Sequence, residues 1–333
     1  MKRDLIKPLH GLRGIAALTV VFGHYGIVTS TPSLGVVLFF ILSGFLIGKL
    51  YMERPFNTKE VSSYVVARFA RIYPLFALVV VGTGVLNMVF PDAQVFYLEP
   101  DQIVPHLLLF GSNMTIWTIC AEFQFYLVFI AIWWMQTKSR NVWWIILPIL
   151  FVSFAYGASL GAGAGRTDIF SYLHVFSLGL IISILTRESH PKFDRVAAVG
   201  LPIFVVAYAT VYFAYPRLGF TERAIYVHPL VLLICAGLLL TSLAAGENWV
   251  NRLLSLPPAI WLGEVSFGIY LLHRPVGWAL DVELPHHPFN KLGAVAVTMI
   301  LAQVAHMAIE KPSRDALRKW GATLIHQRRI SSP

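Results

Sequence analysis

Charged residues are scarce in this sequence. Only 13% of its 333 residues are Asp, Glu, Lys or Arg, and 57% are hydrophobic, whereas about 25% of an ordinary soluble chain is charged. The mean hydropathy is correspondingly high, at +0.68. The shortage of charge excludes a soluble globular protein and predicts a multi-pass membrane protein.

Cysteine and acidic residues are also few. The two cysteines, Cys120 and Cys235, lie in apolar runs without metal-ligand or disulfide spacing, so we expect core residues and predict no metal. The sequence has 17 acidic and 26 basic residues, which gives a net charge of +9. Such an excess is typical either of nucleic-acid-binding proteins or of cytoplasmic loops in membrane proteins.

What the sequence has in quantity is long hydrophobic runs. Each can cross about 30 Å of hydrocarbon, and the loops between them are too short for a soluble domain. The runs lie near residues 11–30, 34–51, 72–90, 116–136, 142–160, 168–186, 196–215, 225–244, 261–280 and 292–309.

The basic residues fix the predicted orientation. With the N-terminus in the cytoplasm, 21 of the 26 basic residues fall on the cytoplasmic side and 5 on the other, as the positive-inside rule requires. We therefore predict an all-α integral membrane protein, a bundle of about ten transmembrane helices with both termini cytoplasmic. A single transmembrane domain covers 1–312, and a basic, loosely ordered cytoplasmic tail covers 313–333. Membrane lipid is an expected partner and nucleic acid is not.

The first run carries two unusual polar residues, Arg13 and His24. They are eleven positions apart, which on a helix is about 16 Å along the axis and nearly the same side. A guanidinium at one end and an imidazole at the other suit a substrate with phosphates at one end and its reacting group at the other. The alternative is that His24 is a packed, hydrogen-bonded residue. A signal peptide is a further alternative for this run, but a His in its core and the closely following second run favour a retained helix.

Two arginines at the start of the third run form a second candidate. Arg68 and Arg71 are three positions apart and share a helix face. They either anchor the helix to anionic lipid headgroups or form a phosphate site together with Arg13.

The fourth and later runs contain further polar residues. A carboxylate such as Glu122 is costly in an apolar helix unless it is paired or functional. Thr118 lies four positions earlier, on the same face of the helix. His174 is either functional or a hydrogen-bonded core residue. A polar stripe on one face of the ninth run comprises Ser266, Tyr270 and His273.

Taken together, these residues resemble the acyltransferase-3 family, the multi-spanning bacterial membrane acyltransferases that modify surface and secreted carbohydrates. The resemblance covers nearly the whole chain and depends on six motifs in order. These are Gly11–Leu12–Arg13–Gly14 with His24; Gly35 with Phe39–Phe40 and Ser43–Gly44–Phe45–Leu46; Arg68–Phe69–Ala70–Arg71–Ile72–Tyr73–Pro74; Trp117–Thr118 with Glu122 and Phe125–Tyr126; Ser266 with Tyr270–Leu271 and His273; and Glu310–Lys311–Pro312.

The sequence departs from the family pattern at two positions. His10 stands where an Asp usually precedes the Gly–Leu–Arg–Gly motif, which leaves the partner of Arg13 open. Thr118 stands where a Ser usually follows Trp117, and this change keeps the hydroxyl.

The resemblance implies an O-acyltransferase of the bacterial inner membrane. Its donor is cytoplasmic acyl-CoA, usually acetyl-CoA, and its acceptor is a carbohydrate hydroxyl reached from the other side. It implies His24 and Glu122 as catalytic residues and Arg13, Arg68 and Arg71 as donor-binding residues. Weaker acceptor-binding candidates are Thr118, His174, Ser266, Tyr270 and His273.

Two other classes of function compete with this one. A proton-coupled secondary transporter of a glycan or small molecule also buries His, Glu and Arg, but no inverted repeat is visible and the arginines cluster at one face. A structural membrane subunit would tolerate apolar residues at these positions. Four points stay open: the acceptor, the acyl chain length, whether transfer is direct or passes through an acyl-His intermediate, and the oligomeric state. Because no hydrolase-like domain follows the last run, we expect the membrane domain to complete the transfer.

Overall fold

A computed structural model describes residues 6–28, 32–93, 95–139, 141–160, 168–186, 224–228, 231–232, 234–237, 239, 249–280 and 288–330. These residues are helical or lie in turns and short connections, with no β-strand among them. The chain forms two compact units. Met1–Met52 and Asn141–Ser266 make the first, and Glu53–Arg140 and Phe267–Pro333 make the second.

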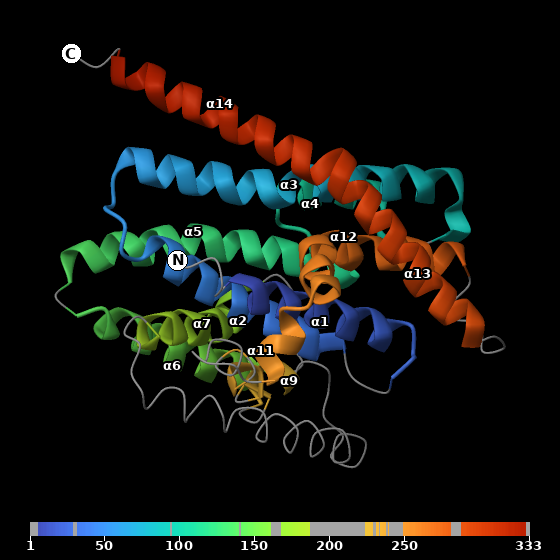
Figure 1. Cartoon of the computed structure of the whole chain (residues 1–333), viewed down its shortest axis with the longest axis horizontal. Helices are drawn as coiled ribbons and strands as arrows, with labels where there is room; N and C mark the ends of the chain where they lie inside the picture. The colour runs from blue at the N-terminus through green and yellow to red at the C-terminus, as the bar shows by residue number, and fades with distance from the viewer. Residues whose placement is uncertain are drawn as a thin grey trace. The chain divides into compact units, whose positions relative to one another are not determined.

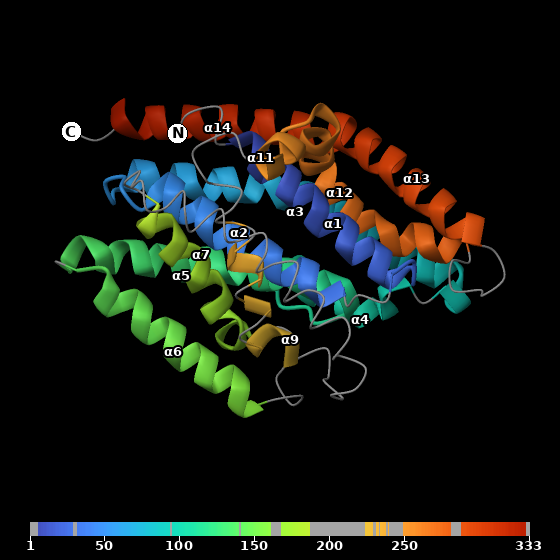
Figure 2. The same cartoon turned by 60° about the horizontal axis from the view of Figure 1, so that its bottom comes forward.

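The first unit is a group of packed helices, in which α2 lies along both α1 and α7, and α7 lies along α6. Figure 2 shows the α6 and α7 pair in green. The helices of this unit are α1 (Ile6–His24), α2 (Pro32–Tyr51), α6 (Trp143–Leu160), the 3-10 turn η6 (Ile169–Ser171), α7 (Leu173–Leu185), α9 (Ala224–Val227), α11 (Trp249–Leu254) and the beginning of α12 (Pro257–Ala279).

Glycines allow these helices to approach closely. A Cβ on Gly44 of α2 would overlap the backbone carbonyl of Phe176 in α7, and one on Gly179 of α7 would overlap that of Ile41 in α2. Small residues are the usual means of close helix packing in membranes. Gly44 and Gly179 therefore allow α2 and α7 to pack closely against each other.

In the second unit, α3 is the long central helix. It contacts α4, the π-helical turn η7 and α14, and Figure 1 shows α14 in red beside the blue α3. The elements are α3 (Thr58–Val89), η2 (Pro91–Ala93), η3 (Val95–Tyr97), α4 (Pro100–Leu107), η4 (Met114–Ile116), α5 (Trp117–Lys138), the rest of α12, α13 (Pro288–Ala305), η7 (His306–Glu310) and α14 (Lys311–Ile330).

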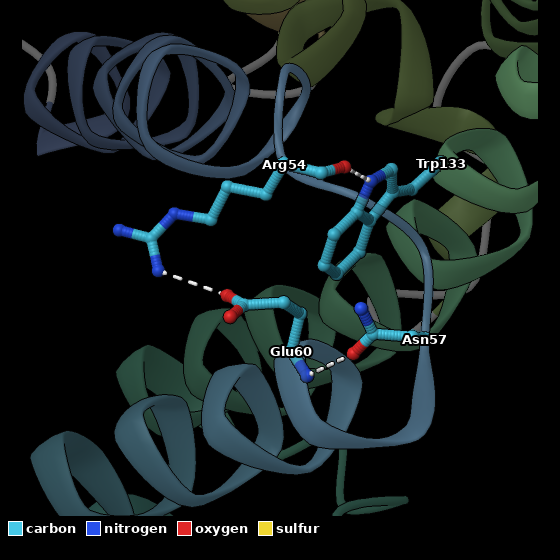
Figure 3. Close-up of polar contacts among 4 residues, drawn as sticks. All are labelled: Arg54, Asn57, Glu60 and Trp133. Carbon is cyan, nitrogen blue, oxygen red and sulfur yellow. Dashed lines mark hydrogen bonds and ion pairs between the residues drawn. The ribbon is translucent and has the colours of Figure 1, made fainter.

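Polar contacts fix the start of α3 (Figure 3). The side chain of Asn57 caps the helix by accepting a hydrogen bond from the Glu60 backbone N–H at 2.9 Å. Arg54 forms an ion pair with the Glu60 carboxylate at 3.2 Å, and Trp133 of α5 donates its indole N–H to the Arg54 carbonyl at 3.0 Å. These contacts join α3 to α5 and so set the register of the arginines further along α3.

Five helices among the described residues are long and apolar enough to cross a membrane: Pro32–Tyr51, Thr58–Val89, Trp117–Lys138, Trp143–Leu160 and Asn290–Gly321. Each includes one of the predicted runs or most of it, and the shorter apolar helix Leu173–Leu185 matches another. The run 196–215 lies outside the described residues, and 225–244 is described only in pieces. The number of ten spans and the orientation of the termini therefore stay predictions.

The first helix differs from its predicted range of 11–30, because it begins at Ile6 and ends at His24. Gly26 adopts a left-handed φ of 59°. Its N–H bonds to the Gly23 carbonyl at 3.1 Å, and the Ile27 N–H bonds to the Phe22 carbonyl at 2.9 Å. This is a Schellman cap, which closes a helix wherever a glycine can take the left-handed conformation.

The predicted loose order of the tail is wrong for residues 313–330, because α14 continues from Lys311 to Ile330. The sequence places a helix end at Glu310–Lys311–Pro312, since proline lacks the N–H that a regular helix needs. The chain instead widens into the π-helical turn η7, in which the Lys311 N–H bonds to the His306 carbonyl. A π-turn changes the hydrogen-bond register, so Pro312 can be accommodated and the helix continues.

Candidate functional site

Arg13 and His24 both lie in α1, as the sequence predicts. Helical geometry places them on nearly the same side and about 16 Å apart along the axis, and both are half-buried. His24 is the last residue of α1, in the turn whose carbonyl groups carry the negative end of the helix dipole. This position stabilises a positive charge on the imidazole.

The glycines beside Arg13 have a packing function. A Cβ on Gly11 would overlap the backbone of Leu254 in α11, and one on Gly14 would press on Leu262 and Gly263 in α12. In return, a Cβ on Gly263 would overlap the backbone of His10. The Gly–Leu–Arg–Gly motif thus holds one face of α1 against its neighbours and leaves Arg13 on a different face.

The second unit brings together Arg68, Arg71 and Glu122. The guanidinium of Arg68 lies 5.9 Å from the ring centroid of Tyr126, a cation–π distance, and the Tyr126 hydroxyl donates to Glu122 Oε1 at 2.6 Å. The charge of Arg71 lies close enough to act on both Tyr126 and Glu310. Two arginines and the Glu122 carboxylate therefore surround the buried Tyr126, and Arg71 also lies near the second carboxylate, Glu310.

Sequence reasoning missed two members of this group. Tyr126 lies four positions after Glu122, a spacing that puts the two side chains on one helix face and was available as a signal. Glu310 lies far along the chain on η7. Its Glu–Lys–Pro motif is visible in the sequence, but its orientation depends on the π-turn.

Three further candidates from the polar stripe form buried hydrogen bonds. The Tyr270 hydroxyl lies 2.7 Å from the Thr118 hydroxyl and donates to the Thr115 carbonyl, also at 2.7 Å. His273 donates its Nδ1–H to the Tyr270 carbonyl at 2.6 Å. Ser266, in the first unit, donates to the Gly263 carbonyl at 2.8 Å. The Thr118–Tyr270 pair ties α5 to α12.

His174 lies in the first unit with both ring nitrogens engaged. Its Nε2 donates to the Tyr226 carbonyl at 2.8 Å, and its Nδ1 lies 3.2 Å from the Ser153 hydroxyl. The ring also makes an edge contact with Phe154. These bonds link α6, α7 and α9, which is the hydrogen-bonded core arrangement that the sequence leaves open as the alternative.

The described residues contain no cluster of three or more His, Cys, Asp or Glu side chains that could hold a metal ion. Cys120 and Cys235 are both buried free thiols. The polar groups of the two units are thus arginines, carboxylates, hydroxyls and imidazoles, the groups used to bind anions and to transfer protons.

The fold and these polar groups define a multi-pass helical membrane protein. The acyltransferase-3 family, described as an acyltransferase domain, matches residues 6–307, and the chain belongs to this family.

Curated relatives extend this similarity. The chain is 26% identical to YrhL of Bacillus subtilis, a provisionally named peptidoglycan O-acetyltransferase, over 93% of the chain and 55% of YrhL. It is 25% identical to the acyltransferase MdmB of Streptomyces mycarofaciens, over 92% of the chain and 91% of MdmB. It is 20% identical to the peptidoglycan O-acetyltransferase OatA of Listeria monocytogenes, over 94% of the chain and 56% of OatA. The chain thus spans little more than half the length of the two peptidoglycan relatives. No solved structure matches it significantly.

Proposed function

We propose that this protein is a membrane O-acetyltransferase of the bacterial inner membrane. It takes an acyl group from cytoplasmic acetyl-CoA and transfers it to a hydroxyl of a surface or exported carbohydrate. The observation that carries the proposal is the placement of Arg13 and His24 on one side of a single helix, about 16 Å apart along its axis. Membership of the acyltransferase-3 family supports the reaction class.

The donor carries its phosphates and its thioester at opposite ends of a thin pantetheine arm. Arg68 and Arg71 are the proposed phosphate ligands in the second unit, because a guanidinium binds phosphate through two parallel N–H bonds. Arg13 is a third proposed ligand on the strength of its motif. Along α1, the arm would lead the thioester from Arg13 toward the imidazole of His24.

His24 is the proposed general base. It accepts the proton of the acceptor hydroxyl while the hydroxyl oxygen attacks the thioester carbonyl. The carbon–sulfur bond then breaks, and the coenzyme A thiolate takes the proton from the imidazolium. The C-terminal end of α1 favours the imidazolium that forms in between, by about 0.3–1 kcal/mol.

Glu122 is the proposed second catalytic residue, and its bond to Tyr126 fixes the orientation of its carboxylate. Thr118, His174, Ser266, Tyr270 and His273 are kept as proposed acceptor contacts. Since their polar atoms already bond to protein groups, acceptor binding through them requires an exchange of hydrogen bonds.

Donor binding tests this proposal against its rivals. Purified protein should bind and consume acetyl-CoA, which a glycan transporter or a structural subunit should not do. Arg68→Lys and Arg71→Lys should each weaken acetyl-CoA binding, because a point charge loses the paired geometry. Arg54→Lys is the matched control, since Arg54 is exposed and paired with Glu60. Unchanged affinity in the first two variants would leave only lipid anchoring for these arginines.

The acceptor needs a separate experiment. Mass spectrometry of surface glycans from cells with and without the protein should show an O-acetyl group that depends on it. Identical glycan profiles would contradict a carbohydrate acceptor.

A further inference from the structure

Tyr126 contacts two groups to which the proposed function gives different tasks. It lies on α5, and only 4% of its surface is exposed. Its hydroxyl donates to Glu122 Oε1 at 2.6 Å, and the guanidinium carbon of Arg68 lies over its ring, 5.9 Å from the centroid. One buried side chain thus contacts the proposed catalytic carboxylate with its hydroxyl and a proposed donor-binding cation with its ring.

The position of Tyr126 is fixed by aromatic neighbours. Tyr64 of α3 donates its hydroxyl to the Tyr126 carbonyl at 3.1 Å, and the two rings make an edge contact with centroids 6.3 Å apart. Phe123 makes a second edge contact, at 5.6 Å. Tyr64 lies four positions before Arg68 on α3, so these two side chains share a helix face. The helix that carries Arg68 therefore also holds the ring that Arg68 contacts.

An aromatic ring suits a guanidinium that has to bind phosphate. The ring attracts the cation through its electrons and takes none of its N–H donors, whereas a carboxylate would occupy two of them. The attraction is stronger where water is excluded, and Tyr126 is almost fully buried. The ring can thus hold Arg68 in place without competing with a donor phosphate.

The hydroxyl of Tyr126 suits its own partner for a similar reason. Tyr126 follows Glu122 by four positions on α5, and a short hydrogen bond to a carboxylate is among the stronger ones. A neutral hydroxyl fixes the direction of the carboxylate without cancelling its charge. Glu122 is thus oriented and keeps its negative charge.

We propose that Tyr126 is a positioning residue with two separable tasks. Its ring holds Arg68 for binding of the donor phosphates, and its hydroxyl orients the Glu122 carboxylate for catalysis. This inference rests on the proposed function, because it takes Arg68 to bind acetyl-CoA and Glu122 to act in the transfer. Its consequence is that the two tasks can be removed one at a time.

Tyr126→Phe tests the hydroxyl alone, because a phenylalanine ring also attracts a cation. The dissociation constant for acetyl-CoA, measured on the full-length purified protein, should stay within about twofold of wild type. The rate of acetyl transfer at saturating acetyl-CoA should fall about tenfold or more, the effect of losing a hydrogen bond to a charged group. Transfer is followed in membrane vesicles whose cytoplasmic face is outside, as label that passes from acetyl-CoA to carbohydrate.

Tyr126→Met removes the ring as well as the hydroxyl and keeps a flexible apolar side chain that adapts to the space. It should lower the transfer rate at least as far as Tyr126→Phe does. It should also raise the dissociation constant for acetyl-CoA by about three- to thirtyfold, the range of a cation–π contact. Tyr126→Leu is a second non-aromatic variant if the Met variant fails to fold. An unchanged dissociation constant in the folded non-aromatic variant would overturn the proposal.

Double-mutant cycles show whether each task acts through its partner. Tyr126→Met should cause no further loss of acetyl-CoA affinity in an Arg68→Ala background, and Tyr126→Phe no further loss of rate in a Glu122→Gln background. Additive losses would contradict these tasks. Tyr73→Phe is the matched control, since it removes a tyrosine hydroxyl that bonds to the Leu107 carbonyl at 3.1 Å, and its affinity and rate should match those of wild type.

A core tyrosine without these tasks predicts a different pattern. Tyr126→Phe would then change affinity and rate together, or change neither, and either result would overturn the proposal. The wild type separates the two hypotheses. If it does not bind acetyl-CoA, both the proposed function and this inference fail, whereas normal wild-type binding with silent Tyr126 variants overturns the inference alone.

Discussion

His24 occupies the last position of α1, and its role can be tested by a single substitution. His24→Gln keeps the size of the side chain but removes a base that works near neutral pH. It should therefore abolish transfer, as His24→Ala should, because general acid–base catalysis contributes about 10²–10⁴-fold. The rate of acetyl transfer measures this, with thermal unfolding as the check on folding.

A control variant is available on the same helix. Thr19 donates its hydroxyl to the Ile15 carbonyl within α1, so Thr19→Ala should retain activity. A rate for His24→Gln within a few-fold of wild type would return His24 to the class of packed histidines. If the inactive variants still bind acetyl-CoA, trapping of acetyl-His24 from donor alone in the wild type distinguishes a nucleophile from a base.

A second residue, His106, makes the connection between α3 and α5 sensitive to pH. Its Nδ1–H donates to the Gln102 carbonyl at 2.8 Å, and its Nε2 accepts from the Asn113 N–H at 3.3 Å. Burial lowers the pKa of His106 below its ordinary value of 6.5. The folded connection therefore holds the neutral ring, and protonation of Nε2 would remove the bond from Asn113.

The sign of the pH effect follows from this lowered pKa. Above about pH 6.5 the ring is neutral in both the folded and the open form, so the stabilisation is fully present. As the pH falls below that value the open form binds more protons, and the stabilisation is lost. The protection factors of the amides in residues 102–113, which are hydrogen-exchange rates divided into the intrinsic rates at the same pH, should fall between pH 7.5 and pH 5. This fall should be much smaller in His106→Gln, and an equal fall in both proteins would contradict the assignment.

At the scale of single residues, chemistry was easier to predict than geometry. Arg68 and Arg71 were identified because they share a helix face, and Glu122 because a carboxylate in an apolar run is costly. The structure places Arg68 and Glu122 in one group with Tyr126. Glu310 was not identified, because the direction of its side chain depends on the π-turn η7. The proline at 312 does not by itself predict this turn. The end of α1 was predictable in principle from Gly26.

At the scale of elements, the helices of the first unit pack closely because glycines, which have no side chain, lie where the helices meet. Gly44→Ala would drive a methyl group into the Phe176 carbonyl, and overpacking of this kind typically costs 1–3 kcal/mol. Gly82→Ala in α3 meets nothing within 4 Å and gains helix propensity. We therefore expect a lower Tm for the first variant and an unchanged or higher Tm for the second. Equal Tm values would contradict close packing of α2 on α7.

The helices themselves were largely predictable, because hydropathy and length decide which segments cross a membrane. The ends of the helices were less predictable. The run 72–90 forms only the later part of α3, which begins at Thr58 behind an Asn57 cap. The helix beyond Pro312 was missed for the reason that Glu310 was missed: both depend on η7.

At the scale of the whole molecule, the central claim is that acetyl-CoA reacts from one side of the membrane, the cytoplasmic side. The excess of basic residues predicts both termini in the cytoplasm, and the arginines proposed to bind the donor should lie on that same side. Acetyl-CoA should therefore react only when it is supplied from the side that holds the termini. Terminal reporter fusions should both report a cytoplasmic position.

The most direct measurement uses sealed membrane vesicles of known orientation with acetyl-CoA labelled in its acetyl group. Vesicles whose cytoplasmic face is outside should pass the label from added acetyl-CoA to carbohydrate, and vesicles with the His24→Gln protein should not. Vesicles of the opposite orientation should give no transfer until they are opened. Transfer from the opposite face, equal transfer by the His24→Gln protein, or no consumption of acetyl-CoA by wild type in either orientation would contradict the account.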